Sequence, residues 1–312
     1  MSQPALHVVF GTGALGQRVA AEALTRGHRV RMASRSGRAT VADGVELVAA
    51  DATVVDATTE ACAGATAVHF CAAPPYTHWP ETYGAMQAGV LAGAAAADAV
   101  VVSAESIYMY GKVEGPITES TPYNPCSKKG EIRRRLTEGL LDAHAAGTVR
   151  TVSARAPDYY GPGAAATTVY GERVFPHALA GKAAEIFGKP DALHTWIYVD
   201  DFAKGMVTLA EREEAWGKAW HLPCPAPLTQ RAFLDEVYRQ AGHPTKIRAM
   251  PTWMTPILGW FLPIMRELAE MQYQWTDTYD FRHDAYDAAF GAEHTAHEHG
   301  IAQTLAWFRD QA

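Results

Sequence analysis

Cysteine is scarce in this chain of 312 residues. Only four are present, they lie far apart, and no two have the C-x-x-C spacing. A disulfide-stabilised secreted fold needs a denser pattern, so we expect reduced thiols and a cytoplasmic location. Each of the four is expected to be a small buried side chain: Cys62, Cys71, Cys126 and Cys224.

Positive charge is also in short supply. The formal net charge is -7, the pI is about 6.0, and the densest basic run is only residues 133–135. Nucleic-acid binding depends on clustered lysine and arginine that neutralise phosphates. We therefore expect a small-molecule substrate and no nucleic-acid partner.

Long apolar runs are missing as well. The most apolar later stretch, PTWMTPILGWFLPIM at 251–265, is shorter than a bilayer-spanning helix and contains three prolines. The N-terminal residues lack a basic segment before an apolar stretch, so no signal peptide is expected. The sequence predicts no membrane partner, and residues 251–265 are expected to lie in the core or along a pocket.

Strand and helix patterns alternate regularly in the first half of the chain. Short apolar runs suited to strands occur at 6–10, 29–34, 45–51, 67–73 and 99–106, with Ala-rich helical stretches between several of them. A helix at 131–147 and a strand with a turn at 150–163 follow. This order predicts an α/β fold with a parallel sheet covered on both faces, and ligands at the carboxyl ends of its strands.

A glycine-rich motif, G-x-G-x-x-G, joins the first expected strand to the first expected helix. Gly11 permits a tight turn, Gly13 lets the backbone approach a pyrophosphate, and Gly16 allows the helix to pack closely on the strand. The unpaired N–H groups at the helix N-terminus favour an anion. The intervening residues expected at the same cofactor site are Thr12, Ala14 and Leu15.

The choice of dinucleotide is expected to depend on residues about 20 positions further on. Ser34, Arg35 and Arg38 offer donors and positive charge there without a carboxylate, which favours NADP over NAD. The alternative is that the two arginines are solvated loop charges. Other residues expected to line the cofactor follow the third and fourth strands: Asp51, Ala52, Ala72, Ala73 and Pro74.

The chain resembles the extended short-chain dehydrogenase/reductase superfamily, in its NAD-dependent epimerase/dehydratase branch. The segments that carry the resemblance are FGTGALG at 10–16, SAESIYMYG at 103–111, PITESTPYNP at 116–125, RAPDYYGPG at 155–163 and WIYVDDFAKG at 196–205. The resemblance implies a doubly wound Rossmann domain over 1–157 and a smaller, interleaved C-terminal substrate domain over 158–312. Residues 193–212 are expected to return to the Rossmann domain, and a homodimer is implied.

The catalytic positions of this family are only partly kept. The family uses a Tyr that exchanges a proton with the substrate oxygen, a Lys four residues later, and a Ser or Thr that polarises the same oxygen. Ser106 matches the Ser, whereas Lys129 stands at the Tyr position and Arg133 at the Lys position. The chain is thus identified as an atypical member of the superfamily.

Three interpretations of this replacement stay open. Lys129 could itself donate the proton or stabilise an oxyanion, with Arg133 as a fixed charge that cannot exchange protons. Tyr108 or Tyr123 could supply the phenol from another direction, Tyr108 being better placed. The site could instead do no redox chemistry. Ser106, Lys129, Arg133 and Tyr108 each also have a purely structural interpretation.

Substrate contacts are expected from Tyr76, Tyr123, Asp158 and Tyr159. Asp158 matches a family position that usually carries Asn near the substrate, although a turn-capping role fits it as well. The three histidines of HTAHEH at 294–299 lack further ligands at a convincing spacing, so no metal is expected and a solvated face is favoured.

These observations lead to an expected enzyme, an NADP-dependent oxidoreductase. Aromatic residues in the second half favour a small apolar or aromatic carbonyl, alcohol or activated alkene as its substrate. One alternative is a nucleotide-sugar epimerase or dehydratase, as the family name implies. Another is a non-catalytic NADP-binding regulator.

Overall fold

A computed structural model of the chain describes residues 4–165 and 168–311. The chain forms two compact units that interleave along the sequence. The first comprises Met1–Ser106, Ile132–Arg155 and Phe202–Leu222, and the second comprises Ile107–Glu131, Ala156–Asp201 and Pro223–Ala312.

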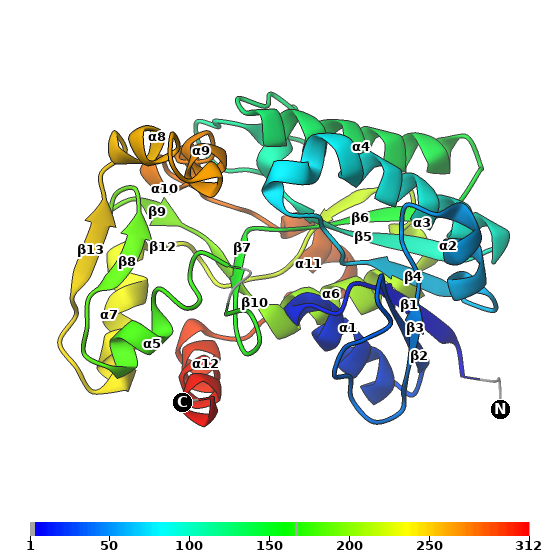
Figure 1. Cartoon of the computed structure of the whole chain (residues 1–312), viewed down its shortest axis with the longest axis horizontal. Coiled ribbons are helices and arrows are strands. Elements are labelled where there is room, and N and C mark those ends of the chain that lie inside the picture. Colours follow the sequence, from blue (N-terminus) through cyan, green and yellow to red (C-terminus); the bar gives the residue numbers. More distant parts are fainter. Residues whose placement is uncertain (1–3, 166–167, 312) are drawn as a thin grey trace. The chain divides into compact units, whose positions relative to one another are not determined.

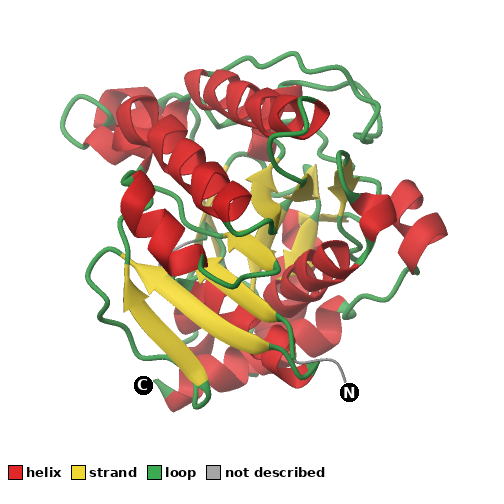
Figure 2. Ribbon diagram, turned by 90° about the vertical axis from the view of Figure 1, so that its right-hand side faces the viewer, coloured by secondary structure: helices red, strands yellow, loops and turns green. Residues whose placement is uncertain are grey.

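The first unit is built on a parallel sheet of seven strands (Figure 1; strands yellow in Figure 2). The strand order is β11-β6-β5-β4-β1-β2-β3, so the chain reverses direction across the sheet between β1 and β4. In open α/β sheets, ligands bind at the carboxyl edge beside such a switch point. The strands are β1 (Leu6–Phe10), β2 (Arg29–Ser34), β3 (Val45–Ala49), β4 (Ala67–Phe70), β5 (Val100–Ser106), β6 (Thr151–Ala156) and β11 (Ala219–His221).

Helices cover both faces of this sheet. Figure 1 shows α2 (Val55–Cys62), α3 (Gly84–Ala96) and α4 (Lys128–Ala145) on one face, and α1 (Ala14–Thr25) and α6 (Val199–Glu211) on the other. Small residues allow close packing of α3: a Cβ at Gly89 would lie 2.1 Å from the carbonyl oxygen of Ala52. On the opposite face Arg26, which follows α1, pairs with Glu211 of α6 at 2.8 Å.

The α/β fold with a parallel sheet is confirmed. Strands β1 to β6 lie where the sequence predicted strands. β1 and β4 are buried along their whole length, as expected of parallel strands covered on both faces. The seventh, β11, was not anticipated. It has only three residues, AWH, too few to show a pattern.

The second unit contains three small two-stranded sheets: β7 with β10, β8 with β13, and β9 with β12. Its helices α5, α7 and α12 pack together around aromatic rings, including Phe175 stacked on Phe308. The strands are β7 (Asp158–Tyr160), β8 (Ala184–Phe187), β9 (Leu193–His194), β10 (Trp196–Tyr198), β12 (Leu228–Thr229) and β13 (Ile247–Met250). The helices are α5 (Phe175–Leu179), α7 (Gln230–Ala241), α8 (Met254–Leu258), α9 (Pro263–Ala269), α10 (Tyr273–Thr276), α11 (Asp284–Phe290) and α12 (His297–Asp310).

The apolar stretch 251–265 differs from the expectation of a core segment. Trp253, Trp260 and Phe261 are 67%, 87% and 77% exposed. The short helices α8 and α9 pack on each other and bury little more than Thr255, Met265 and Leu268, which leaves the large rings outside. Among the described residues, no helix is long and apolar enough to cross a membrane.

Candidate functional site

The glycine loop that follows β1 has two positions where backbone atoms approach too closely for any side chain. Gly11 has φ +113°, and a Cβ there would lie 2.9 Å from the backbone nitrogen of Ala72. A Cβ at Gly16 would lie 2.0 Å from the carbonyl oxygen of Gly11. Gly13 differs, because no atom lies within 4 Å of its added Cβ. The open side of this loop is therefore at Gly13.

The helix that begins at this loop presents an uncapped N-terminus. Gly13 is the N-cap of α1, no side chain caps the helix, and its first turn contains no acidic residue. Ala14 and Leu15 are buried against the unit, so the first turn is held by packing. Backbone N–H groups and the helix dipole there favour an anion such as a phosphate.

The carboxyl end of β2 lies at the same edge. The Oγ of Ser34 is buried and has no hydrogen-bond partner in the described structure, which is costly unless a ligand supplies one. Arg35 and Arg38 are exposed beyond it, with Gly37 at φ +61° forming the turn between them. A buried hydroxyl beside two exposed cations suits the ribose of a dinucleotide.

The loop after β3 is held by its own hydrogen bonds. The carboxylate of Asp51 accepts from the backbone nitrogen and the hydroxyl of Thr53 at 2.9 and 2.7 Å. These bonds, and then the charge of Arg35, lower the pKa of Asp51. Asp51 thus shapes the turn into α2, and its predicted contact with the cofactor stays a prediction.

The loop after β4 packs against the glycine loop. The backbone nitrogen of Cys71 donates to the carbonyl oxygen of Phe10, which brings Ala72 against Gly11. The indole of Trp79 donates to the carbonyl oxygen of Pro74 at 2.9 Å and fixes the end of this loop. The open face at Gly13 and the unpartnered Ser34 hydroxyl together fit a dinucleotide along this edge.

Ser106 ends β5, the strand beside β4. Its Oγ is buried and, like that of Ser34, has no hydrogen-bond partner in the part of the chain described. The adjacent Glu105 is fully buried and accepts hydrogen bonds from the hydroxyls of Thr137 and Ser153 at 2.7 and 2.6 Å. These hydrogen bonds hold Glu105 in place, and the Ser106 hydroxyl is available to a ligand oxygen.

Arg133, in the part of α4 that belongs to the first unit, is buried among aromatic rings. Its guanidinium lies 5.2 Å from the ring centre of Trp79 and 4.9 Å from that of Tyr83, and it donates to the Tyr83 hydroxyl at 2.9 Å. Such stacking holds a permanent cation in a fixed orientation. Tyr76 packs edge-on against Trp79, with ring centres 5.1 Å apart.

Lys129, in the first turn of α4 and in the second unit, is 2% exposed. Its Nζ donates to the carboxylates of Glu267 and Glu270, in the latter case at 2.6 Å. Glu270 also accepts from the backbone nitrogen of Lys128 at 2.7 Å. The two glutamates lie at the end of α9, and they are residues that the sequence interpretation missed.

The segment around Tyr108 packs closely on this first turn. A Cβ at Gly130 would lie 2.6 Å from the carbonyl oxygen of Tyr108, which explains the glycine after Lys129. The rings of Tyr110 and Tyr123 lie 5.7 Å apart. Tyr108 itself is half-buried within the short helix Tyr108–Tyr110. The second unit thus gathers Tyr108, Tyr123 and Lys129, while the first holds Ser106 and Arg133.

Asp158, at the start of β7, has buried partners. Its Oδ2 lies 3.0 Å from the Nε2 of His194 and accepts a hydrogen bond from the indole of Trp275 at 3.0 Å. The next residue, Tyr159, is half-buried. Neither His194 nor Trp275 was linked to Asp158 by the sequence, since strand and loop patterns do not encode such pairings. The substrate roles of Asp158 and Tyr159 stay predictions.

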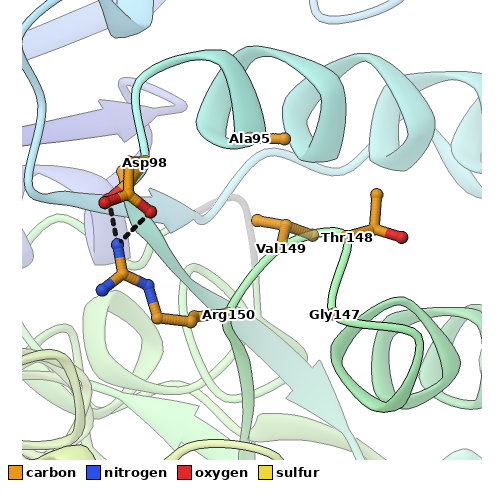
Figure 3. A pocket seen from close by; sticks show the side chains of 7 residues that line it. Ala95, Asp98, Gly147, Thr148, Val149 and Arg150 are labelled. Atoms are coloured by element: carbon orange, nitrogen blue, oxygen red, sulfur yellow. Dashed lines mark hydrogen bonds and ion pairs between the residues drawn. The ribbon is translucent and has the colours of Figure 1, made fainter.

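A small recess of about 190 Å³ lies at the opposite edge of the sheet, before β5 and β6 (Figure 3). Asp98 and Arg150 form an ion pair across its rim at 2.7 Å. Ligands of open α/β sheets bind at the carboxyl ends of the strands, so this recess at the amino ends is no candidate site. Within residues 4–165 and 168–311, no group of three or more His, Cys, Asp or Glu could hold a metal ion.

Solved structures share this fold over nearly their whole length. A dTDP-glucose 4,6-dehydratase from Bacillus anthracis, in complex with NAD, has 13% identity and a TM-score of 0.80, covering 98% of this chain and 97% of that one. The UDP-glucose 4-epimerase of Thermus thermophilus, in complex with NAD, has 16% identity and a TM-score of 0.78, covering 98% and 100%. An epimerase from Methanothermobacter thermautotrophicus has 16% identity and a TM-score of 0.81, covering 99% and 93%.

The sequence itself carries the family signal. A search of curated proteins finds no match. The model of the NAD dependent epimerase/dehydratase family matches residues 8–221, which include the glycine loop, Ser106, Lys129, Arg133 and Asp158. Since this match covers more than half of the chain, the protein belongs to the NAD dependent epimerase/dehydratase family.

Proposed function

We propose that the chain is a nicotinamide-dinucleotide-dependent enzyme of the epimerase or dehydratase type, acting on a hydroxyl-bearing sugar derivative such as a nucleotide sugar. The family match supports this alternative better than the expected oxidoreductase for apolar carbonyls, for which the comparisons offer no support. NADP is the proposed cofactor because Arg35 and Arg38 supply positive charge beyond β2 and no carboxylate stands beside them.

The observation that carries the proposal is the carboxyl edge of the first unit. The open side of the loop lies at Gly13, and Ser34 keeps a buried hydroxyl without a partner. Gly11 to Gly16 would hold the pyrophosphate, Ser34, Arg35 and Arg38 the adenosine ribose and its phosphate, and Ala72 to Pro74 the body of the dinucleotide. When bound, the nicotinamide supplies reversible hydride acceptance from a substrate carbon.

The residues of the chain then have distinct tasks. The free Oγ of Ser106 would hydrogen-bond the substrate oxygen whose carbon gives up the hydride. Arg133, fixed by Trp79 and Tyr83, would provide a permanent positive charge and hydrogen-bond donors. Lys129 keeps an ammonium at the family's Tyr position, anchored by Glu267 and Glu270. Tyr108 remains the phenol best placed to exchange the proton.

The test is turnover without added oxidant or reductant. Purified protein with NADP would be incubated with a panel of UDP- and dTDP-hexoses, and the sugar would be followed by proton NMR. An epimerised or dehydrated sugar, formed with no net change in reduced nicotinamide, is expected. Net consumption of NADPH with simple ketones or enones, and no change in any hexose, would contradict the proposal and favour a simple reductase.

A further inference from the structure

His194 is a fully buried side chain whose two ring nitrogens both face hydrogen-bond acceptors. Its Nδ1 lies 3.0 Å from the carbonyl oxygen of Gln274, and its Nε2 lies 3.0 Å from Oδ2 of Asp158. A carbonyl oxygen cannot donate, so Nδ1 carries a hydrogen. A second hydrogen must lie between Nε2 and Oδ2, because two bare acceptors do not approach to this distance.

The carboxyl group of Asp158 is oriented by this contact. Oδ2 accepts a second hydrogen bond, from the indole of the buried Trp275 at 3.0 Å. Two N–H donors on one oxygen favour the carboxylate and leave the shared hydrogen on His194. Oδ1 forms no hydrogen bond with a described residue, yet it is not sealed from solvent, since the side chain remains 17% exposed.

The surroundings of the pair contain aromatic rings and neutral phenols. Tyr279 stacks on the imidazole at 5.5 Å, and Trp196 and Tyr170 lie at 4.8 and 5.8 Å between ring centres. Burial, helped by the charge of Asp158, raises the pKa of Tyr170 well above the ordinary value. Burial, helped by Tyr273 and then by Asp158, does the same for the pKa of Tyr279, so both phenols stay neutral. Asp158 is the one charged side chain with a hydrogen bond to His194 among the residues described.

We propose that His194 and Asp158 form a buried imidazolium–carboxylate pair that presents Asp158 Oδ1 as a hydrogen-bond acceptor for a substrate hydroxyl. A carboxylate accepts hydrogen bonds and repels anionic oxygens, so this position selects an uncharged hydroxyl of the sugar over a phosphate. His194 acts as a positioning residue, because it holds the oxygen that the substrate does not use. The identity of the ligand rests on the proposed function, whereas the ion pair does not.

The ion pair is tested by the ring nitrogens of His194 in full-length protein labelled with 15N-histidine. We expect both nitrogens to be protonated at pH 7 in the wild type. In Asp158→Asn the carboxamide carries no charge to balance an imidazolium, so one ring nitrogen should lose its hydrogen. Nδ1 faces a carbonyl oxygen and should keep its hydrogen, so the loss is expected at Nε2. An unprotonated Nε2 in the wild type would overturn the ion pair.

The hydroxyl selection is tested by calorimetry with dTDP-glucose and with dTDP as probes, in the presence of NADPH. The wild type should bind dTDP-glucose more tightly than dTDP, and this ratio of affinities is the gain from the hexose. In Asp158→Asn and His194→Gln the gain should fall about 10-fold or more, while the affinity for NADPH stays unchanged. Asp191→Asn, which alters an exposed carboxylate paired with Arg231, is the matched control and should retain the gain.

The two proposals fail in different ways. Sugar-nucleotide turnover with an unprotonated Nε2 would overturn the ion pair and leave the proposed function. If both ring nitrogens of His194 are protonated but dTDP-glucose binds no more tightly than dTDP, the substrate assignment for Asp158 is overturned and the ion pair stands. An equal loss of gain in Asp191→Asn would attribute the effect to net charge and overturn the specific contact.

Discussion

At the scale of single residues, different glycines of the glycine loop serve folding and cofactor binding. Gly16→Ala would place a methyl group 2.0 Å from the Gly11 carbonyl oxygen, so we expect it to destabilise the protein by about 2–3 kcal/mol. Gly13→Ala meets no atom within 4 Å, and its φ of -77° suits alanine, so its stability should stay within about 0.5 kcal/mol of wild type.

Urea unfolding and NADPH titration of both variants check this distinction. Gly13→Ala should fold normally and still lose NADPH affinity, because the methyl group occupies the side of the loop that the pyrophosphate would approach. Full NADPH affinity in Gly13→Ala would contradict the placement of the cofactor at this loop.

The unpartnered hydroxyl of Ser106 gives a second residue-scale prediction. Ser106→Ala removes a hydroxyl that has no hydrogen-bond partner in the described structure, so the free energy of unfolding should change by less than about 0.5 kcal/mol. Turnover should fall about 100-fold or more in kcat, because a donor to the reacting oxygen is lost. A variant as active as wild type would remove Ser106 from the site.

The contacts that fix side chains at these positions lie beyond the sequence pattern. Lys129 meets carboxylates 138 and 141 residues away, and Asp158 meets His194 at a separation of 36. No periodicity encodes such pairings, and the acidic partners are ordinary surface residue types. The sequence predicted the helix from residue 131, whereas α4 begins at Lys128 and includes Lys129, and only the fold identifies what anchors Lys129.

At the scale of elements, the contact between the first turn of α4 and the end of α9 predicts a stability effect. Lys129→Met leaves the carboxylates of Glu267 and Glu270 beside each other without their cation. Their side chains remain 18% and 22% exposed, so the cost should be about 2 kcal/mol, below the 3–5 kcal/mol of a fully buried pair.

The triple variant Lys129→Met, Glu267→Gln, Glu270→Gln is the control, measured by thermal and urea unfolding. Removing all three charges should recover most of the lost stability. If this stable variant is inactive, the cluster of Lys129 with Glu267 and Glu270 acts in the reaction as well as in the fold. If it turns over normally, the proton and the charge come from elsewhere, and Tyr108 becomes the leading candidate.

Helices and strands were predicted correctly where the residues of a single segment determine its structure. The run at 6–10 is apolar and buried along its whole length, whereas the segment 29–34 alternates arginine with buried Val30 and Met32. The structure has strands there with the same bounds. The stretch 251–265 is also rich in apolar residues and was expected in the core or along a pocket, but two short helices interrupted by prolines cannot bury three large rings at once. Composition alone does not decide which apolar segment is covered.

At the scale of the whole molecule, each unit contains a histidine that resists protonation. Burial, with the charge of His28 adding to it, lowers the pKa of His7 to about 4, and burial lowers that of His297 to about 4. An unfolded histidine titrates near 6.5, so below that pH the unfolded chain binds more protons than the folded one. Stability should therefore be full above pH 6.5 and be lost progressively as pH falls through 4.

The measurement is urea unfolding between pH 7.5 and 4, with an expected loss on the order of 3 kcal/mol per histidine. Carboxylates with lowered pKa values also cause a loss of stability at the acid end of this range. The informative quantity is therefore the difference in the free energy of unfolding between the wild type and His7→Gln. That difference should shrink as pH falls from 6.5 to 4. His78→Gln, at an exposed position, should follow the wild-type curve throughout, and an unchanged difference for His7→Gln would contradict the lowered pKa.

The central claim, that the first unit binds a phosphorylated nicotinamide dinucleotide at its carboxyl edge, is tested most directly by calorimetric titration with NADPH and NADH. We expect NADPH to bind more tightly, and Arg35→Ala to weaken NADPH about 10- to 100-fold while leaving NADH nearly unchanged. Arg248→Ala, at an exposed arginine of the second unit, should change neither. Equal binding of both nucleotides that is insensitive to Arg35 would contradict the NADP assignment, and binding of neither would contradict the account of the site as a whole.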